Sequence, residues 1–75
     1  MSPTETTLIA GLAEILEADP ATLTPETPLA AHGWDSVAVL STIAFIDEQY
    51  GITVSGDELS RCATVRDISN LIAKS

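Results

Sequence analysis

The side chains that could do chemistry gather in one segment, Gly33-Trp34-Asp35-Ser36, directly after the only histidine, His32. A serine acts as a nucleophile only when a base lies within hydrogen-bond reach and a third group orients that base. A hydrolase would need His32 as the base, and no triad or oxyanion pattern accompanies it. Ser36 can instead cap a helix. It can also carry a phosphate group, which an exposed helix N-terminus favours.

The helix that follows Ser36 decides where this hydroxyl lies. Residues 37–50 contain neither Gly nor Pro and are strongly apolar, and Gly51 follows as a natural C-terminal stop. The pattern predicts a helix over 37–50 with Ser36 at its N-cap. Before it, residues 19–35 hold three prolines. We predict a long ordered loop there, with two side chains reaching the core, Leu23 and Leu29.

The other predicted helices each begin with a serine or threonine followed three residues later by an acid, the pattern of a capping box. They cover residues 3–18, opened by Ser2 and Glu5; 56–61, opened by Ser55 and Glu58; and 65–73, opened by Thr64 and Asp67. Three main helices, one short helix and a long first connection predict an all-α fold, a small helical bundle. The chain is short enough that residues 1–75 form one domain.

The composition limits the class of protein. The chain has 11 acidic and 3 basic residues among 75, for a formal net charge of −8. This argues against nucleic acid or an anionic membrane as a partner, because both need a basic footprint. One cysteine, Cys62, permits no internal disulfide, which fits a reducing cytoplasm, and we expect it to be a buried structural residue. No membrane-spanning run, signal peptide or metal-ligand spacing is visible, so we expect a cytoplasmic monomer without a metal.

The predicted helix over 37–50 has more apolar surface than one core-facing stripe needs. Four residues recur at helical spacing and form the expected core stripe, Val39, Ile43, Ile46 and Tyr50. Three more apolar residues extend the band, Val37, Leu40 and Ala44, and two acids flank it, Asp47 and Glu48. The extension is either a wider buried face or an exposed strip. An exposed strip would suit a partner surface that is apolar inside and basic at its rim.

Over essentially all 75 residues the chain resembles an acyl carrier protein, or a related phosphopantetheine-binding carrier domain. The resemblance includes the amphipathic first helix and the G-x-D-S segment ending in Asp35-Ser36. It continues with the apolar residue Val37, the helix ending Asp47-Glu48-Gln49-Tyr50-Gly51 and the Thr64-Val65 opening of the last helix.

The resemblance implies a non-catalytic carrier. Ser36 would receive 4′-phosphopantetheine from coenzyme A through a separate phosphopantetheinyl transferase, with Asp35 beside it. The thiol of that arm would carry an acyl or aminoacyl group as a thioester. The family's partners, which include loading ligases and downstream synthases, would dock through basic patches onto the loop and second helix. The implied docking residues are Asp35, Val37, Leu40, Ala44, Asp47 and Glu48.

Two positions depart from the pattern of fatty-acid carriers, which usually show acids soon after the serine. Here Ala38 and Ser41 stand in that region. A dedicated carrier for a polyketide, nonribosomal-peptide-like or lipid-modifying pathway is therefore an alternative to fatty-acid synthesis. A second alternative is a carrier-fold interaction module that is never modified. Trp34 is bulkier than expected before the Asp. We predict that it packs the loop against the second helix, with an indole that flanks the bound arm as the alternative.

Overall fold

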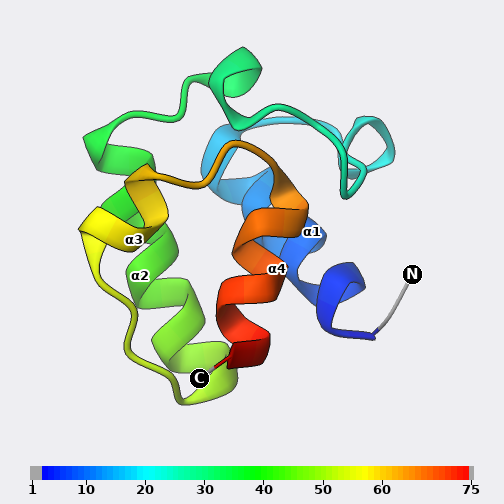
Figure 1. Cartoon of the computed structure of the whole chain (residues 1–75). Helices are drawn as coiled ribbons and strands as arrows, with labels where there is room; N and C mark the ends of the chain where they lie inside the picture. Colours follow the sequence, from blue (N-terminus) through cyan, green and yellow to red (C-terminus); the bar gives the residue numbers. More distant parts are fainter. Residues whose placement is uncertain (1–2, 75) are drawn as a thin grey trace.

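The computed structural model describes residues 3–74, and these form an all-α bundle (Figure 1). The helices are α1 (Pro3–Leu16), α2 (Ser36–Tyr50), α3 (Gly56–Ser60) and α4 (Val65–Lys74), with 3₁₀ turns η1 (Pro20–Thr22) and η2 (Leu29–His32) in the first loop. This confirms the predicted fold class of three main helices and one short helix. Within residues 3–74 no helix is long and apolar enough to cross a membrane. The predicted N-cap Ser2 lies outside the described residues.

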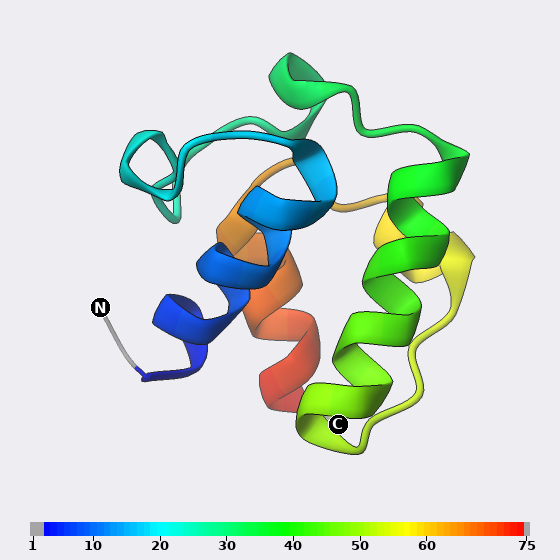
Figure 2. The same cartoon turned by 180° about the vertical axis from the view of Figure 1, so that it is seen from behind.

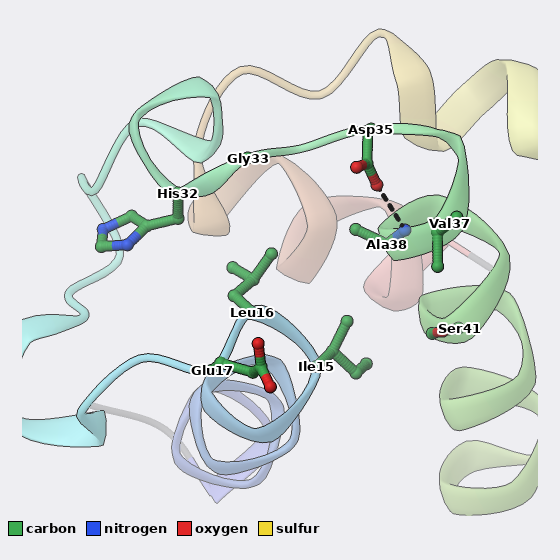
Figure 3. Close-up of a pocket in the computed structure, with 9 residues that line it drawn as sticks. All are labelled: Ile15, Leu16, Glu17, His32, Gly33, Asp35, Val37, Ala38 and Ser41. Atoms are coloured by element: carbon green, nitrogen blue, oxygen red, sulfur yellow. Dashed lines mark hydrogen bonds between the residues drawn. The ribbon is translucent and has the colours of Figure 1, made fainter.

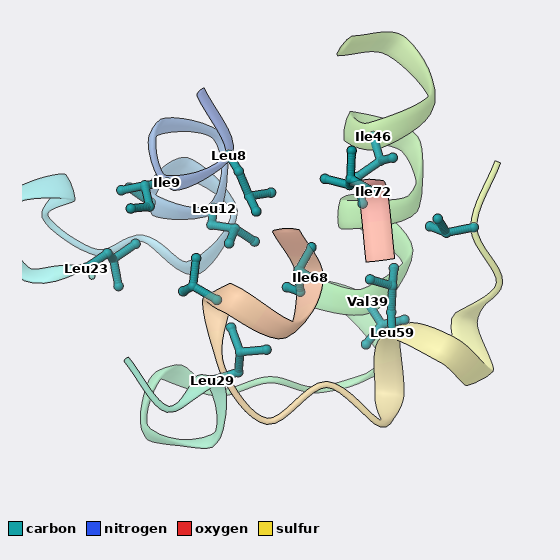
Figure 4. Packing of buried hydrophobic residues seen from close by; sticks show 13 residues of the cluster. Leu8, Ile9, Leu12, Leu23, Leu29, Val39, Ile46, Leu59, Ile68 and Ile72 are labelled. Atoms are coloured by element: carbon teal, nitrogen blue, oxygen red, sulfur yellow. The ribbon is translucent and has the colours of Figure 1, made fainter. Parts of the chain in front are cut away.

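The core lies between α1, α2 and α4, whose side chains point toward one another (Figure 4). The two views show α3 beside the first half of α2 (Figures 1 and 2), where the α-carbon of Gly56 faces the side chains of Val39 and Ile43. Both leucines predicted to anchor the loop are buried, Leu23 and Leu29. The largest fully buried apolar side chains are Leu8, Leu12, Leu29, Ile46, Leu59, Val65 and Ile68.

The first loop is ordered because its backbone is bonded to the start of α4 and to the residues just before it. The N–H of Leu29 donates to the carbonyl of Ala63 at 2.9 Å, and the N–H of Arg66 donates to the carbonyl of Pro25 at 2.8 Å. A side-chain ion pair joins Arg66 to Glu26 at 2.8 Å. These contacts fix a segment that is otherwise almost without regular structure, and so determine where its far end meets α2.

The first helix ends two residues earlier than predicted, at Leu16 and not at Ala18. Glu17 adopts a left-handed backbone with φ of 54°. The N–H of Ala18 then donates to the carbonyl of Ala13 at 2.9 Å, and the N–H of Glu17 to that of Glu14 at 3.3 Å. This bond pair is a Schellman motif. The turn of the chain at Glu17 therefore ends the helix before Pro20 can.

Phe45 turns away from the core stripe of α2 and onto α1. Its ring lies over Gly11: a Cβ added there would collide with Cζ of Phe45. The same ring meets Tyr50 edge-on, with centroids 6.2 Å apart. Gly11 therefore permits a close approach of α1 and α2 that a larger residue would prevent.

Candidate functional site

The N-cap of α2 is Asp35, which corrects the prediction that Ser36 holds this position. Asp35 has an extended backbone, and its carboxylate accepts the N–H of Ala38 at 2.9 Å (Figure 3). The N–H of Asp35 donates to the carbonyl of Gly33, a residue in the left-handed region with φ of 73°. This turn places Asp35 at the cap, so Ser36 becomes the first helical residue.

Because Asp35 supplies the cap, the hydroxyl of Ser36 is not needed to hold the helix end. Ser36 is exposed. The N–H groups of a helix's first turn have no partner within the helix, and the positive end of its dipole is there. The Ser36 oxygen therefore stands in solvent, in a position that favours an attached negative group.

A groove of about 490 Å³ lies beside Ser36, between the first turns of α2 and α3. Its lining includes Trp34, Ser36 and Leu40. The indole N–H of Trp34 donates to the carbonyl of Leu59 at 3.2 Å. Trp34 therefore also bonds the loop to α3, a contact that the sequence did not predict.

His32 lies in a different hollow from Ser36. It is half-buried and lines a cleft of about 240 Å³ between the loop, the end of α1 and the start of α2 (Figure 3). No hydrogen bond joins His32 to Ser36 among residues 3–74. The nucleophile–base contact of a serine hydrolase is thus not formed. The same described residues contain no group of three or more His, Cys, Asp or Glu side chains arranged to hold a metal ion.

The apolar extension of α2 is exposed, which excludes the interpretation as a wider buried face. Val37 is 71% and Leu40 65% exposed, and Ala44 is also exposed. The flanking acids Asp47 and Glu48 are exposed too. In contrast, the predicted core stripe faces inward, with Val39 and Ile46 buried and Ile43 and Tyr50 packed against the core.

Both arginines pair away from this region. Arg61 pairs with Asp57 at 3.0 Å on α3, and Arg66 pairs with Glu26. No ion pair among residues 3–74 involves the acids at either end of α2. The start of α2 and its exposed strip therefore present carboxylates that no ion pair of the described residues engages.

Cys62 is only partly buried, where the sequence predicted a buried residue. Its thiol donates to the carbonyl of Glu58 at 3.5 Å. Burial, followed by the negative charges of Asp67 and Glu58, raises the pKa of the Cys62 thiol to about 11. The thiol is therefore protonated at neutral pH and is a poor nucleophile.

Comparison with known proteins agrees with this geometry. The profile of the family described as "Phosphopantetheine attachment site" matches residues 6–72. The chain is 36% identical over 73 residues to acyl carrier protein MbtL of Mycobacterium tuberculosis, covering 96% of this chain and 87% of MbtL, and equally similar to MbtL of Mycobacterium bovis. It is 31% identical over 64 residues to the non-reducing polyketide synthase ausA of Aspergillus calidoustus, covering 85% of this chain and 3% of that protein.

The family match covers most of the chain and includes the loop, the exposed Ser36, all of α2 and α3, and α1 and α4 except residues 3–5 and 73–74. A carrier of this family holds 4′-phosphopantetheine and is not itself catalytic. Transferases and biosynthetic enzymes act on it. The chain is therefore a member of the phosphopantetheine-binding carrier family, with the acyl carrier proteins among its relatives.

Proposed function

We propose that Ser36 bears the 4′-phosphopantetheine arm and that the arm carries acyl or aminoacyl intermediates as thioesters. A transferase would form a bond between Oγ of Ser36 and the β-phosphorus of coenzyme A. The pyrophosphate bond of coenzyme A breaks, and adenosine 3′,5′-bisphosphate leaves. The observation that carries the proposal is the exposed Ser36 hydroxyl at the first position of α2, left unused because Asp35 supplies the cap.

The residues around Ser36 fit this group. The phosphodiester is an anion, and the N-terminus of α2 offers backbone N–H groups and the positive end of the helix dipole. Such a placement contributes about 0.3–1 kcal/mol for an exposed charge. Asp35 acts by keeping the first turn of α2 intact, through its bond to Ala38 at 2.9 Å.

For docking, we propose the exposed strip of α2 together with its acids: Asp35, Val37, Leu40, Ala44, Asp47 and Glu48. Val37 and Leu40 supply apolar contact area. The carboxylates, which form no ion pair among the described residues, supply a negative electrostatic potential that attracts basic partner surfaces. With a net charge of −8, encounters are accelerated by electrostatic steering and slowed by added salt. The partners in this proposal are a phosphopantetheinyl transferase, a loading ligase and downstream synthases.

For the pathway, we propose a specialised one in preference to general fatty-acid synthesis. Ala38 is buried in the first turn of α2, and Ser41 is exposed one turn on without adding a charge. The acidic side chains that fatty-acid synthesis enzymes would meet just after the serine are therefore missing. Among the relatives, one is named a polyketide synthase and others acyl carrier proteins, which favours acyl cargo.

The test is intact mass after incubation with coenzyme A, Mg²⁺ and a permissive phosphopantetheinyl transferase. The wild-type chain should gain one phosphopantetheine, and a folded Ser36→Ala variant should gain none. Gain by both proteins would place the arm elsewhere. No gain with several transferases would favour the unmodified interaction module, which uses the exposed strip alone.

A further inference from the structure

The groove between the first turns of α2 and α3 begins at the proposed attachment point, because Ser36 is one of its lining residues. Its volume of about 490 Å³ lies within the roughly 300–1,000 Å³ of pockets that take small ligands. Both views show α3 beside the first half of α2 (Figures 1 and 2). A group attached to Ser36 therefore has a hollow of sufficient size directly beside it.

One face of α2 forms a side of this groove. Ser36, Val39 and Leu40 all line it, and their spacing of three and four residues places them on the same side of the helix. Val39 is buried, whereas Leu40 is 65% exposed. Leu40 therefore stands one turn from the attachment point with most of its apolar surface uncovered.

Trp34 lines the groove from the loop, and its indole is held in place. The indole N–H donates to the carbonyl of Leu59 at 3.2 Å, and Leu59 is fully buried in α3. The side chain of Trp34 is partly buried against the core and also lines the groove. An aromatic side chain that is already fixed offers a large apolar contact area at little further cost in entropy. Trp34 is therefore a preformed apolar surface beside Ser36.

The chemistry of the 4′-phosphopantetheine arm matches these two apolar residues. After the phosphate and one methylene group, the arm carries a quaternary carbon with two methyl groups. Ser36 and Leu40 are about 6 Å apart along the axis of α2, so this dimethyl group is the part of the arm that first comes within reach of Leu40. Among the described residues that line the groove, Asp35 alone is charged, and its carboxylate is bonded to the N–H of Ala38. The rest of the lining is neutral, as is the arm beyond its phosphate.

We propose that Trp34 and Leu40 hold the arm in the groove between α2 and α3 when no partner is bound, by packing against its dimethyl group. The phosphate would stay at the N-terminus of α2, and the two methyl groups would cover apolar surface of Leu40 that now faces solvent. The bond from Trp34 to Leu59 contributes by fixing the indole before the arm arrives. The inference rests on the proposed function, since it assumes an arm on Ser36.

The test is NMR spectroscopy of the isotope-labelled holo chain, with complete loading verified by intact mass. Nuclear Overhauser effects should connect the two methyl groups of the arm with ring protons of Trp34 and methyl protons of Leu40. The indole N–H resonance is assigned without ambiguity, because Trp34 is the only tryptophan, and it should shift between the apo and holo forms. A fully loaded chain without these effects would overturn the inference alone. No gain of mass would overturn the proposed function, and the inference with it.

Leu40→Ala and Val37→Ala form a matched pair of variants. Each removes an exposed apolar side chain of α2, but only Leu40 lines the groove, whereas Val37 lines the cleft beside α1. In fully loaded protein, Leu40→Ala should reduce the apo-to-holo shift of the Trp34 indole N–H about two- to fivefold, the value of one partly buried apolar side chain. Val37→Ala should leave that shift unchanged. Equal reductions in the two variants would overturn the assignment of Leu40 to the arm.

Discussion

Replacing Asp35 and Ser36 one at a time tests whether the serine hydroxyl is free of a structural role. Asp35→Ala removes the carboxylate that accepts the Ala38 N–H at 2.9 Å. Loss of an N-cap costs about 0.5–2 kcal/mol of folding free energy. For a domain of this size each kcal/mol lowers Tm by about 4–8 °C. We therefore expect the Tm of Asp35→Ala to lie roughly 2–16 °C below that of the wild type, most often near the middle of this range.

Ser36→Ala should behave differently because Ser36 is an exposed first-turn residue and not the cap. Alanine has a higher helix propensity than serine, and surface changes of this kind stay within about ±0.5 kcal/mol. The assay is thermal unfolding for Tm and urea unfolding for the free energy, both followed by circular dichroism, with equal m-values checking that compactness is unchanged. A loss for Ser36→Ala as large as that for Asp35→Ala would refute the assignment of the cap.

Asp35→Asn separates the cap from the charge of Asp35. Asparagine is as good an N-cap as aspartate, so only the attraction between the carboxylate and the helix dipole is lost. Stability should therefore fall by about 0.3–1 kcal/mol, less than in Asp35→Ala. If loading by the transferase falls equally in both variants, the charge of Asp35 and not its capping bond contributes to recognition.

Four further changes probe the packing, the backbone, the strip and the thiol. Gly11→Ala should destabilise the fold by about 1–3 kcal/mol in urea unfolding, because the new methyl would strike the ring of Phe45; an unchanged midpoint would show that the ring moves freely. Glu17→Gly should raise stability by up to about 1 kcal/mol in the same assay, since φ is 54° there and relief of the left-handed backbone, about 1–2 kcal/mol, exceeds the about 0.4–1 kcal/mol that glycine adds to the freedom of the unfolded chain; a loss would contradict the left-handed backbone. Leu40→Glu should lower kcat/KM for loading by a transferase about fivefold, as for a contact worth 1 kcal/mol, while the unfolding midpoint stays near wild type; unfolding would instead make Leu40 a core residue. Cys62 should react with iodoacetamide at pH 8 at least tenfold more slowly in the folded chain than in urea, because its pKa of about 11 lies above the ordinary 9.0. The same raised pKa should lower the free energy of unfolding as pH rises from 9 toward 11. Equal alkylation rates in the folded chain and in urea would contradict the raised pKa.

The helices could be predicted from sequence because their signals are local. Ser55 accepts the N–H of Glu58 at 3.0 Å, and the Glu58 carboxylate accepts the N–H of Ser55 at 3.3 Å, as the capping box requires. Gly51 has φ of 66° and ends α2 as predicted. Each of these features is decided by residues within one turn of the helix end, so the sequence contains all the information that is needed.

The sequence-based predictions differed from the structure where local signals were ambiguous, or where the contacting residues are far apart in the sequence. Asp35 and Ser36 are equally good caps and adjacent, and the turn at Gly33 decides between them. Glu17 gives no sign of a left-handed backbone, because glycine and asparagine are the residues that usually indicate one. Trp34 donates a hydrogen bond to Leu59, 25 positions further along the chain, so the sequence near Trp34 does not identify this partner.

The long loop, which carries little regular structure, determines how the candidate site faces solvent. Its middle is bonded to the connection just before α4 through Leu29 and Ala63, and its end is bonded to α3 through Trp34 and Leu59. Neither anchor lies on α2, so the first turn of α2 is held without being covered. A carrier needs this combination, since its serine must be rigid enough for a transferase to recognise and open enough for several enzymes in turn. Loosening the anchor with Trp34→Phe, which removes only the indole donor, should therefore reduce loading more than it reduces the stability of α2.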